Sequence, residues 1–231
     1  METTYVDLFA TKGIEYLLVL GFLPVLAIFW RMLNASQYAA PVLAMAEATA
    51  GAVSPWFRIH EGIFYHQGHS WAEPEGIDVV RVGIDDFAQK LLGKASVVEL
   101  PEVGARVEQG DRGLRVGIGG KSVEILSPVD GEIVERNEEV LRRPELINAD
   151  PYGSGWLMKV RVPKMEANLR NLLSGTLASA WMEETVDGLR TRLAGEMGML
   201  LQDGGVPVAG MARNLSPEGW DEIAKDFLLT R

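Results

Sequence analysis

The longest uninterrupted apolar stretch lies near the N-terminus. Residues 16–30 contain no charged side chain, and Glu15 and Arg31 flank them. A helix needs about 20 predominantly apolar residues to cross a bilayer, and this stretch reaches that length only if both flanking side chains extend to the interfaces. Aromatic residues stand at both of its ends, as they do at membrane–water boundaries. The pattern predicts a single transmembrane helix within residues 1–34.

Two other interpretations of this stretch stay open. A cleaved signal peptide has a positive leading segment, but Glu2, Asp7 and Glu15 precede the apolar run against one Lys12. The other alternative is a buried helix of a soluble domain, but such a helix does not require the aromatic and arginine residues found at the ends of this stretch. The flanking charge is more positive after the run than before it, so the positive-inside rule places the remainder of the chain in the cytoplasm. We therefore expect a single-pass membrane protein with a cytoplasmic main domain.

The pattern changes twice after the apolar stretch. Residues 35–57 are rich in alanine, serine and glycine, which favours a connector, and residues 58–165 show short alternating runs separated by glycine and proline. Strands are predicted over 77–82, 96–100, 115–118, 122–126, 131–136 and 156–162, and a helix over 84–92. Many short strands with turn signals favour a small sandwich or barrel.

The final part of the chain, residues 166–231, is predicted to be a helical extension. Apolar residues recur at three- and four-residue spacing from 169 to 201, as in one long helix or in two helices broken near Gly188 or Gly195. Ser216, followed by proline, predicts the start of a further helix. The sequence leaves open whether these apolar faces pack on the domain or dock on partner subunits, because an apolar stripe does not indicate what buries it.

Composition excludes several classes of function. The net charge is −10 and no basic stripe is visible, so a nucleic-acid partner is not expected. The absence of cysteine excludes disulfides, thiolate metal sites and thiol catalysis. His60, His66 and His69 lie within ten residues, but their spacing matches no metal motif, so no metal site is expected. Since there is also no nucleophile triad and no phosphate-binding loop, we predict no catalytic residues and no enzyme.

A series of short sequence words runs from residue 69 to residue 156. In chain order they are His69-Ser70-Trp71, VGIDDFAQ at 82–89, VELPEVG at 98–104, SPVDGE at 127–132, PELIN at 144–148 and DPYGSGW at 150–156. In order and spacing these words resemble the H protein of the glycine cleavage system. The resemblance implies a mainly β fold with added α, a lipoyl-type hybrid of barrel and sandwich.

The resemblance also directs attention to one hairpin. The family carries a lipoyl group on a lysine in a tight turn, eight residues before the proline of its Ser-Pro pair. That position is Gly120 here, the neighbouring residue is Lys121, and Gly117 stands where the family usually has a glutamate. A shift of one residue turns a side chain to the opposite face of a strand. We therefore expect no cofactor, and Lys121 is the alternative candidate for lipoyl attachment.

Together these features predict a non-catalytic, membrane-anchored accessory or scaffold subunit with an H-protein-like domain. Its partners would be membrane lipid and the other protein subunits of a larger membrane complex, of a redox or respiratory kind. The alternative is a membrane-tethered lipoyl carrier, which shuttles a group between enzymes through Lys121.

Overall fold

The computed structural model describes residues 21–26, 57, 59–197 and 209–230. Residues 1–51 and 52–231 form two compact units, and residues 21–26 of the first are helical. Over the described ranges no helix is long and apolar enough to cross a membrane. Most of the predicted transmembrane stretch and nearly all of the connector lie outside the described residues, so both stay predictions.

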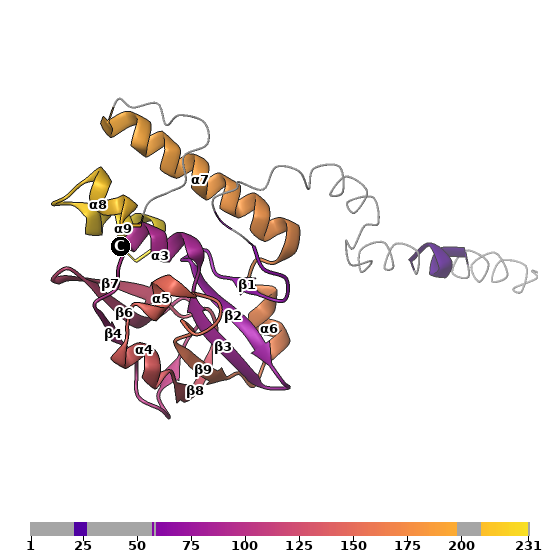
Figure 1. The fold of residues 1–231 in the computed structure, drawn as a ribbon. Coiled ribbons are helices and arrows are strands. Elements are labelled where there is room, and N and C mark those ends of the chain that lie inside the picture. The colour runs from indigo at the N-terminus through magenta and orange to yellow at the C-terminus, as the bar shows by residue number, and fades with distance from the viewer. Residues whose placement is uncertain (1–20, 27–56, 58, 198–208, 231) are drawn as a thin grey trace, which may run out of the picture. The chain divides into compact units, whose positions relative to one another are not determined.

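The second unit is built on antiparallel strands with helices around them (Figure 1). The strands are β1 Phe64–Tyr65, β2 Ser70–Glu75, β3 Val79–Ile84, β4 Val97–Glu99, β5 Arg106–Val107, β6 Arg112–Ile118, β7 Lys121–Leu126, β8 Gly131–Arg136 and β9 Met158–Arg161. The helices are α3 Asp86–Leu92, α4 Glu138–Arg142, α5 Leu146–Ala149, α6 Met165–Arg170, α7 Gly175–Met197, α8 Met211–Leu215 and α9 Trp220–Phe227. One sheet has the order β1-β2-β3-β9-β8-β5 and the other β4-β6-β7. The mainly β fold with added helices is thus confirmed.

Helix α3 forms where its sequence predicts it. The Asp85 side chain accepts a hydrogen bond from the Ala88 N–H at 2.7 Å and so caps the first turn, an interaction that contributes about 1 kcal/mol. Phe87 and Leu91 are fully buried on one face. Gly93 ends the helix with a φ of 87°, a conformation that disfavours side chains with a Cβ.

The core lies between the two sheets and extends under the C-terminal helices. Fully buried side chains of β3, β7 and β9 meet there, among them Val82, Ile125 and Val160. The same apolar cluster includes Leu189 of α7 and Trp220 of α9, which is 3% exposed. The apolar stripe of α9 therefore packs on the domain, which decides one of the alternatives left open by the sequence.

Helix α7 runs unbroken through Gly188 and Gly195, so of the two alternatives from the sequence the single helix holds at these glycines. One local prediction differs from the structure. Helix α9 begins at Trp220 instead of at Ser216, because the Ser216 hydroxyl accepts from the Gly219 N–H at 3.1 Å and closes a turn before the helix.

Candidate functional site

The β6–β7 hairpin turns through two glycines. Ile118 pairs with Lys121 across the ladder, which leaves Gly119 and Gly120 as a two-residue loop with φ values of 56° and 86°. Two successive positive φ angles are typical of a turn whose twist matches that of the strands. The predicted tight hairpin is confirmed, and its tip carries no side chain.

Lys121 is the first residue after this turn. Its side chain is 43% exposed, and its ammonium donates to Asp221 Oδ1 at 2.5 Å and to the Glu218 carbonyl oxygen at 2.6 Å. The Lys121 nitrogen also lies 5.9 Å from the ring centre of Trp220. The structure thus brings the amine that the sequence singled out against the start of α9.

The Lys121 ammonium keeps its carboxylate partner ionised. The hydrogen bond from Lys121, helped by the nearby charge of Lys225, lowers the pKa of Asp221 below its ordinary value. Asp221 also lies 3.5 Å from the Lys225 ammonium, one helical turn along α9. This carboxylate therefore has two cationic partners.

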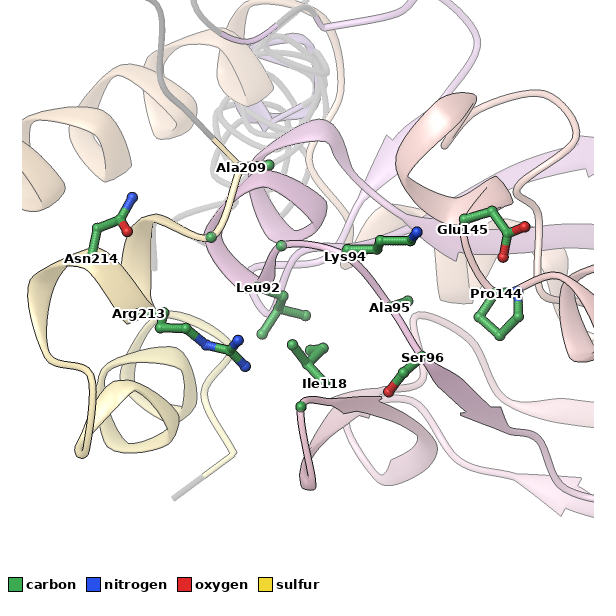
Figure 2. A pocket seen from close by; sticks show the side chains of 13 residues that line it. Leu92, Lys94, Ala95, Ser96, Ile118, Pro144, Glu145, Ala209, Arg213 and Asn214 are labelled. Carbon is green, nitrogen blue, oxygen red and sulfur yellow. The ribbon is translucent and has the colours of Figure 1, made fainter.

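Helix α8 covers the other side of the turn. Arg213 extends toward Ile118 and the turn in Figure 2, and its guanidinium carbon lies 5.4 Å from the Trp220 ring centre. A Cβ at Gly119 would meet this guanidinium, but an arginine side chain is flexible at its end and can move aside, so the positive φ is what favours glycine there.

A pocket of about 520 Å³ lies beside the turn (Figure 2). Leu92 and Ile118 supply apolar lining, and Lys94, Glu145 and Arg213 supply charges of both signs. Lys121 does not line it. The mixture of charges does not select a ligand of one sign.

The three histidines that the sequence placed close together have separate environments. His69 is 1% exposed, and its Nδ1 lies 2.7 Å from the buried Asp85 Oδ2. His66 Nδ1 accepts from the Gly68 N–H at 3.0 Å, while the His60 ring contacts another part of the chain. Within the described parts of the chain there is no group of three His, Cys, Asp or Glu side chains that could hold a metal ion.

His69 and Asp85 form a pair of the kind found in functional sites, and the sequence did not indicate that these two side chains would meet. The imidazole stacks on Phe87 at 4.3 Å and makes a tilted contact with Trp181 at 4.6 Å, centroid to centroid. Asp85 also caps α3, so the pair joins β2, α3 and α7. This enclosure indicates a structural role, since both side chains are closed off from solvent.

His66 should make the stability of the fold depend on pH. Burial, and then repulsion from His69, lowers the pKa of His66 below its ordinary value of 6.5. As the pH falls through about 6.5, the unfolded chain binds this proton before the folded one does, so the free energy of unfolding decreases. It levels off once the pH is below the folded pKa.

The measurement is urea unfolding at pH 7.5, 6.5 and 5.5 for the wild type and for His66→Gln. The glutamine keeps an acceptor for the Gly68 N–H but does not titrate. We expect it to reduce the loss of stability between pH 7.5 and 5.5. An equal loss in both proteins contradicts the assignment.

Known proteins share the hairpin-containing part of this chain. The family model for the glycine cleavage H-protein matches residues 63–185. A probable glycine cleavage system H protein of Pyrococcus horikoshii is 42% identical over 117 residues, which are 51% of this chain and 87% of that protein. The glycine cleavage system H protein of Thermus thermophilus is 47% identical over 110 residues, 48% of this chain and 84% of that protein.

A solved structure gives a similar alignment. The crystal structure of a glycine cleavage system H protein from Mycobacterium marinum aligns with a TM-score of 0.48 and 32% sequence identity, covering 55% of this chain and 99% of that chain. The residues matched by the family model include β6, β7 and their turn and end within α7. Helices α8 and α9 lie beyond them.

Proposed function

Since this chain belongs to the glycine cleavage H-protein family, we propose that it works as a lipoyl carrier and that Lys121 is the attachment residue. It is not an independent catalyst, because carriers of this family present a group to enzymes that do the chemistry. The observation that supports the proposal is the position of Lys121 directly after the two-glycine turn, with a side chain that is 43% exposed.

The residues around Lys121 suit a tethered group in two respects. The turn is tight, and the strands on its two sides are paired with each other, so the end of the hairpin has a defined shape. The open space around Gly120, where an added Cβ meets nothing within 4 Å, leaves one side of the turn accessible. When attached, a lipoyl group supplies a dithiolane on a long flexible stem, which carries a chemical group between active sites.

A second candidate function is an accessory or scaffold subunit that carries no arm. The observation that favours it is the one-residue offset, which puts Gly120 where relatives have their lysine, together with the bonding of Lys121 to the chain's own α9. In this case the surfaces of the domain would bind other subunits of a membrane complex of a redox kind.

Both functions accommodate a membrane anchor, and we propose that residues 16–30 provide it, with the main domain in the cytoplasm. The apolar composition and flanking residues of this stretch support the proposal. Expression of the full chain followed by membrane fractionation tests it. We expect the protein in the membrane pellet, released by detergent but not by high salt, and a variant that begins at residue 52 in the supernatant.

Intact-protein mass spectrometry distinguishes the two functions. From a host that makes lipoate, the wild type is expected to gain the mass of one lipoyl group, and Lys121→Arg is expected to gain none. The control variant is Gly120→Lys combined with Lys121→Ala, which places an amine at the position aligned with the relatives' lysine. A left-handed lysine costs about 1–2 kcal/mol, which the folded domain should tolerate. An unmodified wild type beside a modified control would reject the carrier in favour of the accessory subunit.

A further inference from the structure

We infer that helices α8 and α9, here called the cap, hold the Lys121 amine in contacts that have to break before it can be acylated. The inference deepens the proposed function and rests on Lys121 as its attachment residue. The cap lies outside the residues matched by the family model, yet it closes over the hairpin that this model includes (Figure 1). It would therefore regulate a site that the chain shares with its relatives.

The cap binds Lys121 through the same nitrogen that an acyl group needs. A lysine ammonium has three N–H donors, and two of them are directed at Asp221 and at the Glu218 carbonyl. Acylation forms a bond between this nitrogen and the acyl carbon, while the leaving group departs with its electron pair and the nitrogen gives up two of its three protons to become a neutral amide. The amide has one N–H and no charge, so it cannot keep both contacts.

The aromatic contact is lost for the same reason. The Lys121 ammonium and the Arg213 guanidinium lie 5.9 Å and 5.4 Å from the ring centre of Trp220, distances at which a cation is attracted to the ring. A neutral amide has no such attraction. Acylation of Lys121 and docking of the cap on Lys121 thus oppose one another, and by linkage each weakens the other.

The rest of the cap is anchored independently of Lys121. The N–H of Gly210, just before α8, donates to the Lys90 carbonyl at 2.7 Å, and Trp220 and Ala224 of α9 are buried. These contacts make the docked state the resting one. Asp221 keeps Lys225 as a second partner, so the departure of Lys121 leaves no carboxylate without a cation.

Chemical acetylation of the full-length protein tests the cap without requiring lipoylation. The reagent is the N-hydroxysuccinimide ester of acetic acid, and peptide mass spectrometry gives the rate at Lys121 relative to the exposed Lys94. In the wild type we expect Lys121 to react more slowly than Lys94. Asp221→Asn is expected to raise the relative rate at Lys121 about two- to fivefold, the range for a partly exposed ion pair.

The matched control is Glu222→Gln, which removes the same charge from the adjacent residue. Glu222 pairs with Lys225 and makes no contact with Lys121, so the relative rate should stay at the wild-type value. A second measurement is hydrogen exchange over residues 220–227, which should be faster once Lys121 is acetylated. The inference is overturned if Lys121 reacts as fast as Lys94 in the wild type, or if Asp221→Asn and Glu222→Gln give equal rates.

A failure of the proposed function would give different results from a failure of the cap inference. If the intact mass shows no lipoyl group but Asp221→Asn still exposes Lys121 to the reagent, the carrier role is rejected and the cap is retained. If lipoylation occurs at equal rates in the wild type and in Asp221→Asn, with equal acetylation, the carrier role stands and the cap is rejected.

Discussion

Replacing His69 by alanine is expected to lower the free energy of unfolding by about 3–5 kcal/mol. The imidazole and the Asp85 carboxylate are both closed off from solvent and lie 2.7 Å apart. Alanine would leave the carboxylate with the Ala88 N–H but without its histidine partner, and would open a cavity between Phe87 and Trp181. A buried polar group without its partner and a cavity both destabilise a core strongly.

Urea unfolding of the full chain at pH 7.5, followed by far-ultraviolet circular dichroism, measures this loss. His69→Asn is the matched variant, because asparagine tolerates the φ of 64° observed at this position and keeps a donor within reach of Asp85. It should recover part of the stability. Asp85→Ala combined with His69→Ala should cost less than the sum of the two single changes. A loss below about 1 kcal/mol for His69→Ala would show that the pair is not a determinant of the fold.

The second large effect is expected at the contact between Trp71 and Gly83. Trp71 is fully buried, and its indole N–H donates to the Ile84 carbonyl at 2.9 Å. Trp71→Ala should therefore reduce the free energy of unfolding by about 3–5 kcal/mol. Gly83 is the direct cross-strand neighbour of Trp71, and a Cβ built on it would lie 2.5 Å from the indole ring. Gly83→Ala alone should cost about 1–3 kcal/mol, because the ring has to shift in a packed core.

The two changes should compensate each other when they are combined. In the Trp71→Ala background, the methyl group of Gly83→Ala enters space that the indole has vacated, so it should cost far less than in the wild type. The double-mutant cycle, measured by urea unfolding, gives this coupling. Strict additivity would mean that the glycine is needed for its backbone and not for the close approach of the ring.

The Lys121–Asp221 contact links these stability arguments to function. Its two side chains are 43% and 21% exposed, so the ion pair itself adds little to the free energy of unfolding. The contact matters for what happens to the amine, because it holds the nitrogen between acceptors. In the proposed regulation, helices that lie beyond the residues matched by the family model control access to a hairpin within them.

Some structural features followed from local sequence alone. The strands predicted over 115–118 and 122–126 meet at Gly119 and Gly120, and adjacent glycines are among the few residues that adopt positive φ in succession. The helix predicted over 84–92 forms because Asp85 caps its first turn, and a cap acts within one helical turn. The word His69-Ser70-Trp71 was a signal of the fold, but its reason lies in Gly83 of the neighbouring strand β3 and in Asp85, which follows that strand as the cap of α3.

The sequence by itself determined the hairpin, the mainly β domain and the apolar stripe of α9, because each depends on residues within a few positions of one another. Only the tertiary structure decided that α9 closes on the hairpin. Lys121 and Asp221 are 100 residues apart in the chain, and no periodicity indicates which cation a carboxylate will meet. The apolar side of a helix has the same sequence pattern whether its own domain or a partner protein buries it. Which surface the helix covers therefore depends on the path of the chain in the folded structure.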